Sequence, residues 1–188
     1  MDTKKLIRFA SFVPILALNF NLSLADLSGK FGLAKPVEVE IEIEKENQAM
    51  IILQEQAQAI DAYFAQRNMP LLGYGFKMAE VARKYNLDWR ILPAIAVQES
   101  GGGKHAIWRC KNNPFGWASC DVKFESTEHA IEMVALNLAG ENPRTEKYYK
   151  NKDVKEKLYY YNGTVVSNYP QTVLVIMDKF DSIKNKYE

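Results

Sequence analysis

Residues 91–105 read ILPAIAVQESGGGKH, and this segment decides the fold. From Trp89 to Ser100 the chain is apolar on nearly all sides, which is typical of a helix buried at the centre of a domain. Pro93 falls early in the run, where a helix tolerates proline best. Three glycines follow Ser100, and glycine adopts positive φ and leaves the backbone open to a bulky ligand. The segment therefore predicts a central buried helix that ends beside a glycine turn.

Glu99 stands at the C-terminal end of this predicted helix. The negative end of the helix dipole and the apolar surroundings both disfavour a charged carboxylate, so we expect a raised pKa for Glu99. A carboxylic acid that keeps its proton near neutral pH is what a general acid needs to protonate a glycosidic oxygen. The alternative reading is a solvated glutamate at a helix end.

The neighbouring segments show helical periodicity as well. Residues 47–67 contain neither glycine nor proline and are expected to form one helix. Apolar residues recur at helical spacing from Met78 to Tyr85, and Ser126 is placed to cap a helix that Gly140 stops. Two more helices are expected over residues 153–160 and from about residue 170 onward.

Residues 104–125 differ from these helical segments. They contain both cysteines, two adjacent asparagines before a proline, and short apolar runs, and they predict a small loop or β lobe. The whole sequence therefore predicts a mainly α fold (α+β if the lobe is a hairpin) built around the helix that ends at Glu99.

Residues 1–25 have the pattern of a secretory signal. Basic residues precede an apolar stretch, and Ser23-Leu24-Ala25 supplies small residues for cleavage. The alternative is a retained membrane anchor, although the apolar stretch is short for a span of about 20 residues. On either reading we expect the rest of the chain outside the cytoplasm, in the periplasm, the cell envelope or the medium.

Composition limits the partners of the protein. The 188 residues carry 24 basic and 23 acidic side chains, and this balance argues against nucleic acid as the main partner. Two histidines and two cysteines disfavour a multi-ligand zinc site, so neither a metal nor a cofactor is expected. We expect a monomer, in which membrane attachment depends on the fate of the N-terminal segment.

Four segments are expected along the chain. Glutamates alternate with Val37, Val39, Ile41 and Ile43, which is a strand period, so this acidic stretch is read as a linker or an edge strand. The expected segments are a signal or anchor (1–25), an acidic linker (26–46), an N-terminal helix (47–70) and the main domain (71–188).

Residues 86–139 resemble the core of the glucosaminidase-type (mannosyl-glycoprotein endo-β-N-acetylglucosaminidase-like) domain in the lysozyme-like superfamily of peptidoglycan hydrolases. The resemblance is carried by ILPAIAVQESGGGKH, by NNPFGW (112–117) and by FESTEHAIEMVALNL (124–138). It implies a lysozyme-like fold, Glu99 as the catalytic acid and the glycan strand of peptidoglycan as the partner. Residues 26–70 lie outside it.

The group that assists Glu99 is left open by the sequence. A hydrolase needs a second carboxylate or a water activated in another way, and Asp121, Glu125 and Glu128 are the candidates. Glu128 fits better as a residue that complements the helix dipole in a first turn. A lytic transglycosylase on the same strand needs no second carboxylate, because the 6-hydroxyl of the sugar itself attacks. A non-catalytic module that binds cell-wall glycan is the third possibility.

Cys110 and Cys120 bracket the NNPFGW loop. In an oxidising compartment two cysteines this close are expected to form a disulfide, which would fasten the loop beside Glu99 and contribute roughly 3 kcal/mol in the chain-entropy model. Six side chains are candidates for contact with the sugar, as stacking surfaces or hydrogen-bond partners: Ser100, Asn113, Phe115, Trp117, Tyr161 and Tyr169. The alternative for each of them is a structural role in the core or at a helix end.

Overall fold

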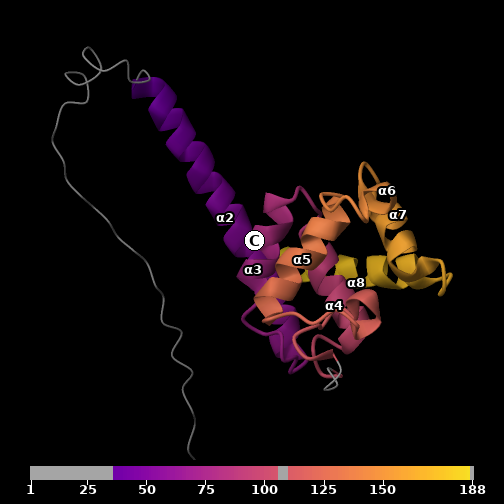
Figure 1. The fold of residues 1–188 in the computed structure, drawn as a ribbon. Helices are drawn as coiled ribbons and strands as arrows, with labels where there is room; N and C mark the ends of the chain where they lie inside the picture. Colours follow the sequence, from indigo (N-terminus) through magenta and orange to yellow (C-terminus); the bar gives the residue numbers. More distant parts are fainter. Residues whose placement is uncertain (1–35, 106–109, 187–188) are drawn as a thin grey trace, which may run out of the picture. The chain divides into compact units, whose positions relative to one another are not determined.

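The computed structural model describes residues 36–105 and 110–186. The predicted signal or anchor therefore lies outside the described residues. Within them the secondary structure is helical, with no strand, so the mainly α prediction is confirmed and the small lobe is a loop (Figure 1). The elements are α2 (Pro36–Gln66), α3 (Gly75–Lys84), α4 (Ile91–Ser100), η2 (Trp117–Cys120), α5 (Thr127–Ala139), α6 (Glu146–Tyr149), α7 (Val154–Leu158), η3 (Tyr159–Gly163) and α8 (Tyr169–Lys184).

Helix α4 forms the centre of the domain, as its apolar sequence predicts. Residues 91–96 are buried, and the helix packs against α3 and α8. Gly101 ends α4 with a φ of 60°, a left-handed conformation that favours glycine. Arg90, just before α4, pairs with Asp181 near the far end of α8. This ion pair joins the N-terminal end of α4 to the C-terminal part of α8. The C-terminal end of α4 lies beside the start of α8.

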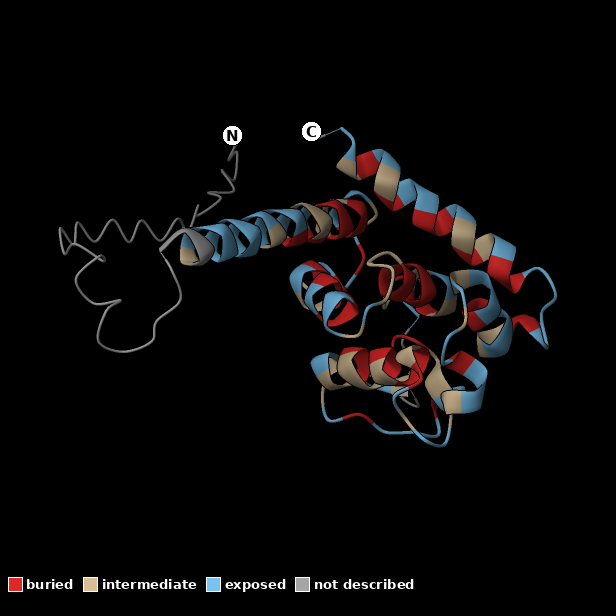
Figure 2. Ribbon diagram, turned by 90° about the horizontal axis from the view of Figure 1, so that it is seen from above, coloured by how far each residue is buried: buried red, intermediate tan, exposed pale blue. Residues whose placement is uncertain are grey.

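Helices α5, α7 and α8 follow the predicted boundaries. The Ser126 hydroxyl accepts the His129 amide at 3.1 Å, and Gly140 ends α5. Asp153 and Glu156 form a reciprocal capping box at the start of α7. The buried residues of α8 lie along one face (Figure 2).

Helix α2 differs from the sequence prediction at its beginning. It starts at Pro36, so the alternating residues 37–46 are helical and the predicted edge strand is wrong, whereas the alternative of a linker stays a prediction. Glutamate is a good helix former, proline is favoured at a first helical position, and no neighbouring strand is present to pair with this segment in the described residues. The part up to Glu44 belongs to a separate unit, whereas residues from Lys45 onward belong to the domain.

The later part of α2 supplies a large share of the core. Ile60, Tyr63 and Phe64 are buried, and the rings of Tyr63 and Phe64 contact Phe180 of α8. This helix therefore serves as a packing element on the opposite end of α8 from Tyr169.

Candidate active site

Glu99 and Tyr169 meet where α4 ends and α8 begins. The Tyr169 hydroxyl donates a 2.6 Å hydrogen bond to Oε1 of Glu99. Glu99 is half-buried, and Tyr169 is only 2% exposed. Because α4 and α8 pack against each other, these two residues are brought together although they are 70 positions apart in the chain.

The surroundings of Glu99 favour its protonated form. Burial raises the pKa of Glu99, and the hydrogen bond from Tyr169 acts in the opposite direction because it stabilises the ionised carboxylate. Burial also raises the pKa of both Tyr161 and Tyr169, so both phenols keep their protons as donors. The raised pKa expected for Glu99 is therefore present.

Gly116 lies against the other oxygen of the Glu99 carboxyl group. Its φ is 60°, and a methyl group added to it would lie 3.0 Å from Oε2 of Glu99. Glycine is thus favoured here for two reasons, the left-handed backbone and the close approach to the acid.

The loop that carries Gly116 is held from both sides. Oδ1 of Asn113 accepts the Trp117 amide at 3.1 Å, and Nδ2 of Asn113 donates to the Trp117 carbonyl at 3.0 Å. Cys110 and Cys120 form the predicted disulfide. It ends a run in which Ala118, Ser119 and Cys120 all have positive φ, a conformation that is unfavourable for residues other than glycine.

Aromatic rings continue the site outward from Tyr169. The Tyr161 ring stacks on Tyr169, with 6.0 Å between centroids and 7° between planes, and its hydroxyl donates to the Phe115 carbonyl at 2.6 Å. The half-exposed Trp117 ring lies 5.5 Å from Tyr161. Glu99, Gly116 and these rings together form the candidate active site.

Comparison with known proteins gives the family. The model of the glucosaminidase family, described as mannosyl-glycoprotein endo-beta-N-acetylglucosaminidase, matches residues 76–182, more than half of the chain. The chain belongs to the glucosaminidase family. No curated protein and no solved structure matches it. The matched span of this glucosaminidase domain contains Glu99, the disulfide-bonded loop and both tyrosines, and the family implies a glycan substrate.

Three of the residues predicted to contact the sugar have structural tasks in the glucosaminidase domain. Ser100 is buried, donates to the Ala96 carbonyl at 3.0 Å and accepts the Gly103 amide at 2.9 Å. Phe115 is completely buried in the core. Asn113 is 2% exposed, and its amide donates one hydrogen bond to Trp117 and accepts one from it. These contacts favour the alternative of parts of the core for Ser100, Asn113 and Phe115, and contact of these residues with a sugar stays a prediction.

Two of the candidates for a second acid lie on the surface of the lobe. The Glu125 side chain is 91% exposed, and its carboxylate lies 3.9 Å from Nδ1 of His129. Asp121 is exposed after η2. Neither contributes to the raised pKa of Glu99, which burial and Tyr169 determine. The role of Asp121 or Glu125 as a second acid stays a prediction.

The importance of Gly116 and of the bond from Tyr161 to the Phe115 carbonyl is not evident from the sequence. The only local signal is that Gly116 follows Phe115 in the NNPFGW segment, since the contacts themselves join elements far apart in the chain. Within the described part of the domain, no group of three or more histidine, cysteine or acidic residues is placed to hold a metal ion. No helix among the described residues is long and apolar enough to cross a membrane.

Proposed function

We propose that this protein is an exported peptidoglycan hydrolase that cleaves β-1,4 glycosidic bonds of the glycan strand, with Glu99 as its general acid. One observation carries the proposal: a half-buried carboxyl group with a raised pKa accepts a hydrogen bond from Tyr169 inside a domain of the glucosaminidase family. The family supports a glycan as the substrate, and the geometry supports Glu99 as the residue that acts on it.

The two carboxyl oxygens of Glu99 have different tasks in this mechanism. Tyr169 occupies Oε1, so the proton resides on Oε2 beside Gly116. In the transition state Oε2 gives this proton to the glycosidic oxygen while the bond from that oxygen to the sugar C1 breaks, and the bonding electron pair goes to the oxygen. A water molecule then forms the new bond to C1 and gives a proton to the ionised Glu99, which restores the acid. As negative charge develops on Glu99, the bond from Tyr169 becomes charge-assisted and stronger.

The aromatic residues position the sugar in the same proposal. Trp117 is partly buried beside Tyr161, and the exposed part of its ring offers a face on which a sugar can stack. Tyr161 acts as a positioning residue, because it joins the loop to Tyr169 by one hydrogen bond and one ring contact.

The disulfide supports an exported location. Disulfides persist in oxidising compartments, and the substrate of a cell-wall glycosidase lies outside the cytoplasm. In our proposal residues 1–25 direct the export, and the bridge keeps the loop with Gly116 against Glu99.

A lytic transglycosylase is the second candidate, and one observation favours it. No carboxylate contributes to the pKa of Glu99, and Glu125 points into solvent. In this reaction Glu99 protonates the leaving oxygen as before, and the 6-hydroxyl of the sugar attacks C1 in place of water and gives its proton to the ionised Glu99. The product then carries a 1,6-anhydro end.

Mass spectrometry of digested walls tests the proposal. Hydrolysis yields fragments with a reducing end, whereas transglycosylation yields fragments that are lighter by one water. Reducing ends that are absent when the Glu99→Gln variant is used support the hydrolase. Fragments with 1,6-anhydro ends instead support the lytic transglycosylase and contradict the hydrolase. Walls left intact by the wild-type protein contradict both proposed activities.

A further inference from the structure

A concave surface lies around η3, outside the candidate active site. We call it the tyrosine groove and define it by six of its lining residues, which come from α7, η3, the connection after η3 and the start of α8: Lys155, Tyr159, Tyr160, Ser167, Pro170 and Gln171. None of them touches Glu99, and the proposed mechanism uses none of them.

The backbone of η3 separates two kinds of tyrosine. Tyr161 turns inward and donates to the Phe115 carbonyl. Tyr159 and Tyr160 turn outward and remain 49% and 37% exposed. The Thr164 amide bonds to the Tyr159 carbonyl at 3.1 Å, which makes η3 a short π-helical turn, a feature found frequently at functional sites. The core therefore does not account for the two outward rings.

Ring contacts connect the groove with the candidate active site. From Trp117 they pass to Tyr149 at 6.2 Å and from Tyr149 to Tyr148 at 6.5 Å. Tyr148 lies 5.6 Å from Tyr160, whose ring lies 5.4 Å from Tyr159. The groove is thus the outer end of a continuous series of aromatic side chains that begins at the partner of Glu99.

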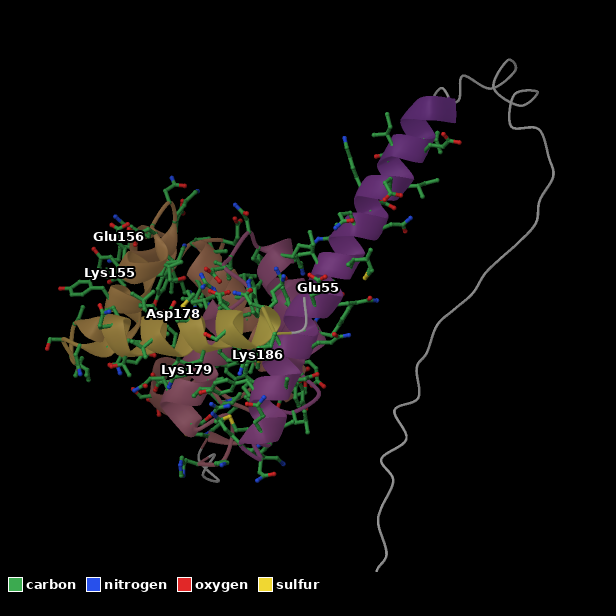
Figure 3. The ribbon with its side chains drawn as sticks, turned by 180° about the vertical axis from the view of Figure 1, so that it is seen from behind. Glu55, Lys155, Glu156, Asp178, Lys179 and Lys186 are labelled. Carbon is green, nitrogen blue, oxygen red and sulfur yellow. A yellow bond between two sulfur atoms is a disulfide. The ribbon has the colours of Figure 1, made fainter. Side chains whose placement is uncertain are left out.

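The polar groups of the groove suit a hydroxyl-rich ligand, and Lys155 adds a cation at its rim. Ser167 and Gln171 are exposed, and neither side chain forms a hydrogen bond to another of the described residues. The acidic residues at the rim are already engaged, because Asp153 and Glu156 cap α7 and Glu156 also pairs with Lys152. Figure 3 shows Lys155 and Glu156 on the outer side of α7. Rings with a few neutral donors and acceptors are typical of a carbohydrate site.

We propose that the tyrosine groove binds a second stretch of β-1,4-linked N-acetylated sugars, away from the bond that is cut. Tyr159 and Tyr160 stack on sugar faces, and Ser167 and Gln171 bond hydroxyl and N-acetyl groups. The inference rests on the proposed function, because it takes the same polymer as the ligand. Its effect is to hold the enzyme on a long strand between cleavage events.

The test measures binding to the full chain carrying Glu99→Gln, so that no ligand is consumed. The probes are the hexamer of β-1,4-linked N-acetylglucosamine, followed by calorimetry, and insoluble peptidoglycan, followed by cosedimentation. Tyr159→Ala combined with Tyr160→Ala is expected to weaken binding about tenfold or more, the scale seen when aromatic anchors are truncated. Ser167→Trp fills the groove from an exposed position and is expected to weaken binding as well.

Phe76→Ala is the matched control, since Phe76 is an aromatic residue that is 42% exposed on α3 and lies outside the groove. Thermal unfolding of each variant verifies that the domain is folded. Equal affinities for the tyrosine variant and the control overturn the inference, and so does binding that requires the peptide stems of the wall. Failure of the wild-type protein to cut walls contradicts the proposed function instead, because binding is measured without cleavage.

Discussion

The Tyr169 hydroxyl donates a 2.6 Å hydrogen bond to Oε1 of Glu99. Burial keeps this phenol protonated, so the direction of the bond is fixed. The carboxyl group therefore has one oxygen held by Tyr169 and one facing Gly116. This asymmetry gives the proposed general acid a defined orientation, and four predictions follow from it and from the loop around it.

Tyr169→Phe removes the hydroxyl and keeps the ring. The hydrogen bond lowers the pKa of Glu99, so its loss raises that pKa further above the ordinary value. A general acid is active while protonated, and the alkaline limb of the pH profile of kcat/KM is expected to move to higher pH. The rate at the optimum is expected to fall roughly tenfold or more, since a bond to a charged group is worth about 1.5–3 kcal/mol. An alkaline limb that stays in place or moves to lower pH contradicts the hydrogen bond between Tyr169 and Glu99.

Gly116→Ala tests the space beside the acid. The added methyl group would lie 3.0 Å from Oε2 of Glu99, whereas a methyl group on Gly73, which also has positive φ, meets nothing within 4 Å. Both variants are expected to lose about 1–2 kcal/mol of stability from the backbone strain. Only Gly116→Ala is expected to lose activity as well, measured as kcat at a temperature where both are folded. Equal activity in the two variants argues against a role for Gly116 in the site.

The disulfide is predicted to stabilise the domain and to order the loop. Replacing Cys110 and Cys120 together by serine is expected to lower the free energy of unfolding in urea by about 3 kcal/mol. Activity is expected to fall at temperatures where the variant is still folded, because Ala118, Ser119 and Cys120 are then free to leave their left-handed conformation. A variant with unchanged stability and activity shows that the Asn113 clamp suffices.

The pH dependence of stability gives an independent reading of Glu99. Its folded-state pKa is raised, so its contribution to stability is fully present below the pKa of the unfolded chain and is lost as the pH rises through the folded-state pKa. Glu99→Gln cannot ionise and escapes this loss. Thermal unfolding is therefore expected to show nearly equal Tm values for the two proteins in acid and a higher Tm for the variant near neutral pH. The difference in Tm between the variant and the wild type is therefore expected to increase from acid to neutral pH. A difference that decreases over this range contradicts the raised pKa of Glu99.

Local rules account for much of the fold. The all-round apolar run predicts the buried α4, and Ser126 and Gly140 predict both ends of α5, because a cap depends only on residues next to it. The disulfide is predictable for a similar reason, since ten positions separate the two cysteines. Position at the end of a buried helix also singles out Glu99.

Contacts between distant segments account for what the sequence does not reveal. The Asn113 side chain has donors and acceptors that suit a sugar. In the folded loop it donates one hydrogen bond to the Trp117 carbonyl and accepts one from the Trp117 amide. The segment from 37 to 46 fits a strand period, and it becomes helical because its glutamates and β-branched residues are also compatible with a helix. The partner of Glu99 lies 70 positions away and depends on how α4 packs on α8.

The rate at which Glu99→Gln digests purified cell walls tests the central claim most directly. Glutamine preserves the shape of the side chain and the acceptor for Tyr169 but has no proton to give. Glu80→Gln is the control, because Glu80 is a surface residue of α3 in the same domain and its side chain is 49% exposed. The account predicts a loss of about 10²–10⁴-fold for Glu99→Gln and wild-type rates for Glu80→Gln. Digestion by Glu99→Gln at the wild-type rate would contradict the assignment of Glu99 as the general acid.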